Sequence, residues 1–217
     1  MNKPIYKYKD WVLDSYLEVY FCYYLQELQD RGYIEEFRQH DKTWALTPKF
    51  TRNYLKQLKT KVNEAEYFIC HPSTYTADFN ILWTPKASNI LFLDPSKPVT
   101  NIKNIPFRLS STDGSLWSHV EIKSINESTT SSSISFVIIQ KVIMDKYNDF
   151  IQKVQPFALS RPAYKKCLFY QTFFPKKVVE EQFYVKSGSW GKAGTSKIKF
   201  PIKTVDEYLK LRGYDNK

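Results

Sequence analysis

The chain has 217 residues, of which 42% are hydrophobic, and this is enough for one α/β domain with a sizeable core. Such a composition excludes a chain that is disordered throughout. The 32 lysine and arginine residues outnumber the 22 aspartate and glutamate residues, giving a net charge of +10. This excess indicates a polyanionic partner: DNA, RNA or an acidic membrane surface.

Cysteine usage and hydropathy indicate the compartment. Cys22, Cys70 and Cys167 are odd in number and far apart, which is typical of reduced thiols in a cytoplasm. The first ten residues lack the apolar core of a signal peptide, and no segment approaches about 18 continuous apolar residues. We therefore expect a cytoplasmic protein that is neither secreted nor inserted in a membrane.

Residues 10–31 are predicted to form a helix, because leucine and phenylalanine recur at mostly fourfold spacing and Gly32 follows as a stop signal. Glu18 is the one charged residue in the apolar run 16–25. A buried carboxylate is costly unless it is paired, hydrogen-bonded or bound to a metal. The alternative is that Glu18 lies at the rim of the core and reaches water.

A basic segment follows, between candidate strands at 43–46 and 66–70. Residues 49–61 are compatible with a helix, and in that conformation four cations would share one face: Lys49, Arg52, Lys56 and Lys59. Such a stripe could face nucleic-acid phosphates. An ordinary solvated surface is the alternative interpretation.

Two strand-like runs carry the polar residues of most interest. Residues 75–83 place apolar side chains on one face and Thr76, Asp78 and Asn80 on the other, by the alternation of a strand. Residues 120–123 likewise bury Val120 and Ile122 and project Glu121 and Lys123 together. If the two strands pair across the long excursion at 84–118, then Asp78, Glu121 and Lys123 converge.

The C-terminal part of the chain, from residue 126 onward, has weaker sequence signals. Residues 126–133 are predicted to be a flexible loop at the lip of this site, 134–154 a helix carrying Lys141 and Lys146, and 167–174 a strand. The chain changes character near Lys176, and a short helix is expected at 205–211. In the glycine-containing tail, three residues could stack on a base or hold a backbone, although a flexible linker explains them equally well: Trp190, Lys192 and Lys197.

The convergent residues suit phosphodiester hydrolysis, which needs an activated water and neutralisation of growing phosphate charge. Mg²⁺ is held by one or two carboxylates plus waters, without a His or Cys cage, so Asp78 and Glu121 are candidate ligands. The Ile122 backbone carbonyl could add a ligand, and Glu18 could bind a second metal or a metal-bound water. Lys123 could orient the attacking water or stabilise the pentavalent phosphorus.

Other catalytic centres have weaker support. His40, His71 and His119 are isolated, and no Gly-rich phosphate-binding loop is present, which argues against nucleotide hydrolysis. His119 lies two residues before Glu121 and could face the same site, with a structural role as the alternative.

The ordered set of a helical Glu18, Asp78 followed by Phe79, the run Val120 to Lys123, and Lys141 in the following helix resembles the PD-(D/E)XK nuclease superfamily. The likeness is greatest to small phage-encoded endonucleases related to Holliday junction resolvases. It implies an α/β restriction-endonuclease-like αβββαβ core, with a mixed central sheet flanked by helices. The core would span 1–177 with an insertion at about 84–118, followed by a basic C-terminal extension at 178–217.

The resemblance further implies cleavage of DNA dependent on Mg²⁺ or Mn²⁺, on branched or replicating phage DNA in the host cytoplasm, and it is compatible with a homodimer. Ala77 stands in place of the proline of the family motif, a residue that is not a ligand. The gap of 43 positions between Asp78 and Glu121 is longer than the usual short hairpin, so Asp94 or Asp113 could compete as a ligand.

The leading hypothesis is thus a metal-dependent DNA endonuclease. Two alternatives remain from other classes. One is a nucleic-acid-binding module that has the same fold and does not cleave, and the other is a phage structural or assembly protein that contacts DNA.

Overall fold

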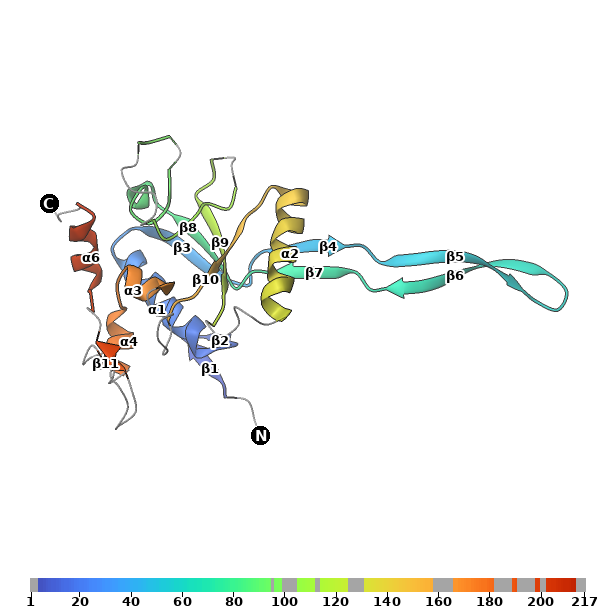
Figure 1. Cartoon of the computed structure of the whole chain (residues 1–217), viewed down its shortest axis with the longest axis horizontal. Coiled ribbons are helices and arrows are strands. Elements are labelled where there is room, and N and C mark those ends of the chain that lie inside the picture. The colour runs from blue at the N-terminus through green and yellow to red at the C-terminus, as the bar shows by residue number, and fades with distance from the viewer. Residues whose placement is uncertain are drawn as a thin grey trace.

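The computed structural model describes residues 4–94, 96–98, 105–111, 114–124, 131–157, 166–181, 189–190, 198–199 and 202–213. It is a mixed α/β structure built on a four-stranded sheet of order β10-β9-β8-β3 (Figure 1). The strands are β3 (Ile34–Gln39), β8 (Phe79–Trp83), β9 (Trp117–Ile122) and β10 (Ile151–Val154). Strands β3, β8 and β9 are antiparallel neighbours, and β10 runs parallel to β9.

Helix α1 (Tyr16–Asp30) covers one face of this sheet. Its N-cap, Ser15, accepts a hydrogen bond from the Glu18 N–H, and Gly32 follows its end in the left-handed region with φ +71°. Phe21 is fully buried and packs edge-on against Phe79 of β8. The predicted helix at 10–31 is confirmed from Tyr16 onward. Residues 11–13 instead form β2 (Trp11–Leu13), paired with β1 (Tyr6–Tyr8).

Helix α2 (Ser131–Tyr147) covers the opposite face, where Phe136 and Ile143 pack against Ile151 of β10. The register places Ile151 beside His119. Because side chains alternate along a strand, the His119 side chain lies on the sheet face opposite to that of Val120, and Val120 lies on the face covered by α1. The expectation of a helix over 134–154 is wrong beyond Tyr147. Asn148 takes a left-handed conformation with φ 51°, and the chain turns there into β10.

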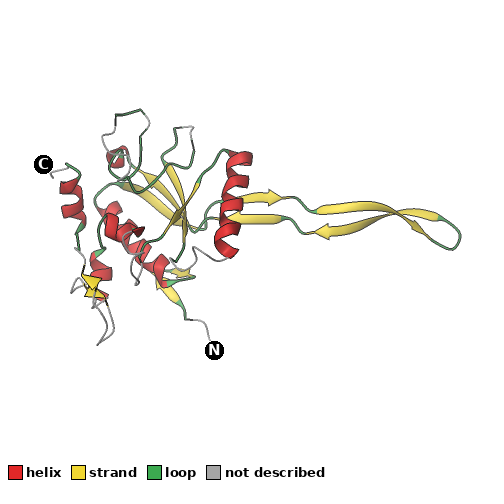
Figure 2. Ribbon diagram, in the orientation of Figure 1, coloured by secondary structure: helices red, strands yellow, loops and turns green. Residues whose placement is uncertain are grey.

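A long two-stranded arm projects from the body (Figures 1 and 2). Its base pairs β4 (Thr43–Thr47) with β7 (Ser73–Thr76), and its outer part pairs β5 (Phe50–Gln57) with β6 (Val62–Cys70). The predicted helix at 49–61 is therefore wrong. Residues 50–57 form an antiparallel ladder with β6 that is interrupted by one register shift between Phe50 and Thr51, and that long-range pairing overrides the local helical spacing.

The predicted strand at 75–83 is divided at Ala77 and Asp78, so that β7 belongs to the arm and β8 to the sheet. Two hydrophobic clusters lie on the two faces of the sheet: the α1 cluster, which includes Phe21 and Val120, and the α2 cluster, which includes Phe136, Ile143 and Ile151. As a result Tyr75 and Ala77 pack in the α2 cluster, whereas Phe79 packs in the α1 cluster. The expected common apolar face of this run does not exist, because the chain changes sheets between its two halves.

The excursion at 84–118 packs on the body. It begins with η1 (Pro85–Ala87) and buries apolar residues of its middle part in the α1 cluster: Ile90, Leu91, Phe92 and Phe107. Strand β9 starts at Trp117 and pairs with β8, so the strand pairing on which the predicted convergence depends is present.

Three C-terminal helices also contribute to the α1 cluster: α3 (Leu168–Gln171), α4 (Lys176–Glu181) and α6 (Val205–Leu211). Two short strands, β11 (Ser189–Trp190) and β12 (Ile198–Lys199), pair with each other. The prediction of a strand at 167–174 is wrong, because this stretch contains a helical turn. The Phe173 ring that follows the turn stacks on the Tyr24 ring, with 4.4 Å between the ring centroids. The helix at 205–211 is confirmed and begins with a capping box between Thr204 and Glu207. Among the described helices none is long and apolar enough to cross a membrane.

Candidate active site

Asp78 and Glu121 meet where β8 and β9 begin to pair. The register places Phe79 opposite Val120 and Asn80 opposite His119, so one further step toward the arm brings Asp78 opposite Glu121. The Ile122 backbone N–H donates to Asp78 Oδ2 at 2.7 Å and fixes that carboxylate beside β9. The convergence expected from sequence is thus present in spite of the long excursion between the two strands.

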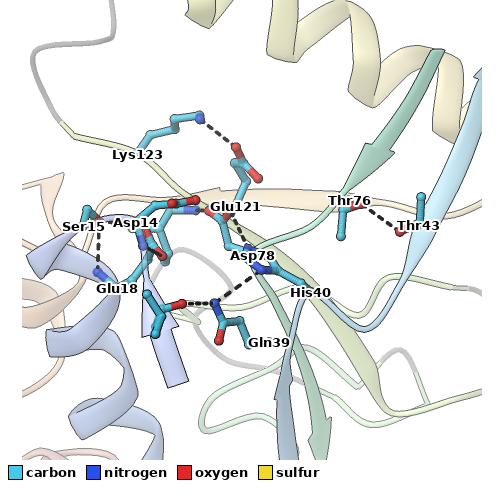
Figure 3. Close-up of polar contacts among 12 residues, drawn as sticks. Asp14, Ser15, Glu18, Gln39, His40, Thr43, Thr76, Asp78, Glu121 and Lys123 are labelled. Atoms are coloured by element: carbon cyan, nitrogen blue, oxygen red, sulfur yellow. Dashed lines mark hydrogen bonds and ion pairs between the residues drawn. The ribbon is translucent and has the colours of Figure 1, made fainter. Parts of the chain in front are cut away.

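Lys123 completes the group from the end of β9. Its Nζ lies 2.6 Å from Glu121 Oε1, and the Glu121 side chain is only 8% exposed (Figure 3). The two residues therefore project on one side of the strand, as alternation predicts. Glu121 Oε2 is buried and has no hydrogen-bond partner among the described residues. Lys123 compensates the Glu121 carboxylate through Oε1, and the nearby Tyr75 hydroxyl interacts with the same carboxylate, so Oε2 has room for a further ligand.

The negative charges are crowded enough to change protonation. Burial raises the pKa of Asp78 to about 8, and the neighbouring Glu121 and, more weakly, Glu18 act in the same direction. The Ile122 N–H and the Lys123 ammonium oppose this shift without cancelling it. Without a bound cation Asp78 therefore keeps its proton at pH 7, and a cation held beside the two carboxylates would favour its charged form.

Two further residues join the group, and one of them, His40, is a histidine that the sequence pattern left isolated. His40 lies with Nε2 3.9 Å from Asp78 Oδ1, and its backbone N–H donates to the Asp78 carbonyl (Figure 3). It takes a left-handed φ of 48°, an unusual conformation that turns the chain from β3 into the arm. The Tyr75 hydroxyl is buried near Glu121, whose charge adds to burial in raising the pKa of Tyr75. Neither residue belongs to a local motif, so no sequence signal identified them.

Glu18 lies at the edge of the group and is held there by the helix start. Its side chain is buried, and both oxygens accept hydrogen bonds, from the Asp14 N–H at 3.0 Å and from Ser15 Oγ at 2.7 Å (Figure 3). The sequence left open whether Glu18 reaches water or is compensated, and the structure shows compensation by a capping arrangement. Its charge still acts on Asp78.

The group offers few protein ligands for a divalent ion. Within the described part of the chain no group of three or more His, Cys, Asp or Glu side chains is arranged to hold a metal. Mg²⁺ needs fewer, because waters and substrate phosphates complete its octahedral shell. The orphaned Glu121 Oε2 and the crowded Asp78 carboxylate fit a hard cation. In an extended strand the C=O and N–H of one residue point to the same side, so the Ile122 carbonyl would lie on the side of Asp78.

A cavity of about 250 Å³ lies next to this pair along the same sheet face, lined in part by His119, Asn80 and Lys42. Asn80 fixes His119 if its amide nitrogen donates to Nδ1 at 2.7 Å, since its oxygen then accepts from two backbone N–H groups at 3.3 Å. Burial first, and then Lys42, lower the pKa of His119 to about 4, so its imidazole is neutral at pH 7. His119 lies on the same face of β9 as Glu121, but its side chain is hydrogen-bonded to Asn80.

The predicted nucleic-acid contacts are dispersed. Arg52 and Lys56 lie on the arm, Lys59 lies in its terminal turn, and Lys49 lies 6.0 Å from the Phe68 ring. They do not form the predicted helical stripe. On α2, Lys141 is exposed, whereas Lys146 donates to the Leu46 carbonyl and so holds the arm base.

The other candidates lie elsewhere. Trp190 belongs to β11, and Lys192 and Lys197 lie outside the described residues. Asp94 bonds to Ser88 and Ser96 within the excursion, and its local bonds do not include the Asp78 group. Asp113 lies outside the described residues.

No family model matches this sequence, and the searches of curated proteins and of solved structures give no match either.

Proposed function

We propose that this chain is a metal-dependent nuclease that hydrolyses phosphodiester bonds in DNA. The observation that carries the proposal is the meeting of Asp78 with Glu121, with Lys123 ion-paired to Glu121 on the same side of β9. Carboxylates from two neighbouring strands with an adjacent amine provide the groups that metal-assisted hydrolysis requires.

The order of the elements around the sheet supports this proposal. Along the chain α1, β3, β8, β9, α2 and β10 follow one another as helix, three strands, helix and strand, with the arm inserted between β3 and β8. This is the αβββαβ order expected of a PD-(D/E)XK nuclease. Asp78 immediately precedes β8 and Glu121 lies in β9, which fits the positions that the resemblance implies for the carboxylates.

Each site residue has a separate task. Asp78 and Glu121 would hold Mg²⁺ or Mn²⁺ with the Ile122 carbonyl, and the ion supplies Lewis-acid activation of water and charge neutralisation at the phosphate. Lys123 donates toward the attacking water or a phosphate oxygen. Glu18 adds negative charge at the edge and keeps the start of α1 in place.

The positive charge fits a polyanionic substrate, and the resemblance to DNA-cleaving nucleases favours DNA. With a net charge of +10 the protein attracts polyanions at long range, and Arg52 and Lys56 extend that attraction along the arm. DNA is the proposed partner, in branched or replicating form, with the protein acting as a monomer or a homodimer.

Cleavage assays test the proposal directly. Labelled duplex, single-stranded, flapped and four-way-junction DNA are incubated with Mg²⁺, Mn²⁺ or EDTA, using the native protein and the variants Asp78→Asn, Glu121→Gln and Lys123→Ala. We expect metal-dependent cleavage that falls at least ~100-fold in each variant, the size of effect seen when a charge-stabilising catalytic group is removed.

Glu35→Gln is the matched control, since Glu35 is an exposed carboxylate of β3, and it should cleave like the native protein. DNA binding that is salt-sensitive, unaffected by Mg²⁺ and never followed by cleavage would instead favour a binding module. The charge of the arm is the observation that makes this second function worth testing.

A further inference from the structure

The arm is the most exposed part of the described structure. Strands β5 and β6 are joined by a tight turn at residues 58–61, in which the Leu58 N–H donates to the Lys61 carbonyl. Nearly all of their side chains are exposed. A two-stranded hairpin that packs against nothing is at best marginally stable in water, so its length and exposure point to a surface that a partner covers.

The two faces of the outer arm differ in chemistry. Cross-strand partners share a face, and the register pairs Arg52 with Tyr67, Tyr54 with Ala65, and Lys56 with Asn63. One face, which we call the cationic face, therefore carries aromatic and basic side chains together: Arg52, Tyr54, Lys56 and Tyr67. Arg52, Tyr54 and Tyr67, together with Asn53, line one shallow hollow.

The other face, which we call the acidic face, carries both carboxylates of the arm. The register pairs Asn53 with Glu66 and Leu55 with Glu64. Neither cation of β5 lies on this face. Because Arg52 and Lys56 are separated from Glu64 and Glu66 by the plane of the ribbon, no cross-strand ion pair neutralises the cationic face.

We propose that the arm is a DNA-binding ribbon that lies in the major groove of the duplex flanking the scissile bond, with its cationic face against the DNA. The position of the scissile bond rests on the proposed function, whereas the binding face does not. A two-stranded β-ribbon fits a major groove about 12 Å wide, and the strong twist of isolated ribbons follows the helical path of the groove. Exposed tyrosines between cations suit contact with base edges and sugars as well as phosphates.

The geometry sets the length of duplex that the arm covers. The arm begins beside the site, because Thr76 at its base is two residues from Asp78. From Thr43 to Gln57 the chain is extended over β4 and β5, which at about 3.3 Å per residue gives a reach of about 45 Å. Measured along the duplex axis at 3.4 Å per step, this is at most about 13 base pairs on one side of the cleaved bond, and the helical path of the groove lowers that number.

A second copy of the chain is a poorer occupant of this face. Residues 49–70 contain five lysine or arginine residues and two glutamates, and the cations of β5 gather on one face. Two such faces would repel one another, whereas phosphates attract both. The charge therefore selects a polyanion.

The test measures DNA affinity in EDTA on the Asp78→Asn background, so that cleavage does not interfere. Fluorescence anisotropy compares Arg52→Ala/Lys56→Ala with Asn53→Glu/Gln57→Glu, which lowers the charge by the same two units on the acidic face. Loss of two phosphate contacts reduces the slope of log affinity against log salt by about 1.8. When the salt concentration rises from 50 to 200 mM, the DNA affinity of the protein with the native arm should therefore fall about 12-fold more than that of Arg52→Ala/Lys56→Ala.

The acidic-face variant should keep the native slope. Equal slopes in the two variants would overturn the proposal, as would conversion of a dimer to a monomer by the cationic-face variant at unchanged DNA affinity. Tyr54→Ala/Tyr67→Ala leaves the charge intact and should weaken binding to duplexes with 18 base pairs of flank more than to those with 6.

The two proposals fail separately. If DNA is bound through the cationic face but never cut, the nuclease proposal falls and the ribbon stands. If DNA is cut with equal efficiency whichever face is changed, and whatever the flank, the ribbon falls and the nuclease stands.

Discussion

Replacement of Asp78 by Asn should change how stability depends on pH. The pKa of Asp78 is raised from 3.8 to about 8 by burial and by the nearby Glu121 carboxylate. In the folded protein without metal the carboxyl therefore keeps its proton across a range in which the unfolded chain has lost it. Stability from this group is fully present below pH 4 and is lost as the pH rises through 8.

The size of the effect follows from the shift. Each pKa unit corresponds to about 1.4 kcal/mol, so between pH 5 and pH 8 the native protein should lose roughly 3 kcal/mol of stability through this carboxyl. The amide of Asp78→Asn does not titrate. The variant should therefore be more stable than the native protein at pH 8 in EDTA, with a difference that shrinks toward pH 5.

Urea unfolding followed by circular dichroism at several pH values measures this difference. Glu35→Gln, at an exposed carboxylate, serves as the control and should follow the native profile. Added Mg²⁺ or Mn²⁺ should recover stability at pH 8 in the native protein and not in Asp78→Asn, because an ion that binds only the folded state stabilises it. Parallel pH profiles of the native protein and Asp78→Asn would refute the reasoning.

Two further substitutions separate structural from catalytic roles. Glu18→Gln should lower stability by about 1 kcal/mol through a weaker helix cap and reduce cleavage less than tenfold, as urea unfolding and cleavage rates would reveal; a loss equal to that of Asp78→Asn would make Glu18 a metal ligand. Asp149→Ala removes the acceptor for the buried Trp44 Nε1–H, 3.0 Å away, and the partner of Lys42. It should cost about 1 to 3 kcal/mol, measured by thermal unfolding against Asp145→Ala on the exposed side of α2, and equal melting temperatures would contradict this.

The parts of the fold that sequence predicted well are those in which short-range pattern and tertiary role agree. Fourfold spacing of leucine and phenylalanine predicted α1, and the capping pair Thr204 and Glu207 begins the predicted C-terminal helix. Alternation along 120–123 correctly separated buried Val120 and Ile122 from the ion pair on the opposite side. In each case neighbours in sequence provide most of the signal.

The errors arose where a distant partner decides the conformation. Residues 49–61 have cations at helical spacing, but β6 supplies a ladder of backbone hydrogen bonds from residues 62–70, and the segment becomes a strand. Residues 75–83 alternate like one strand, yet the chain passes from the arm to the sheet at Asp78. Local periodicity contains no information on which sheet a strand joins.

The site combines both sources. By itself the sequence determined the positive charge, the carboxylates at positions 78 and 121, and the amine at 123, because these depend on residue type and on alternation along a strand. Only the tertiary structure brought Asp78 opposite Glu121 and placed His40 and Tyr75 beside them. It also separated the charges of the arm onto two faces, because all of these depend on which strands pair and in which register.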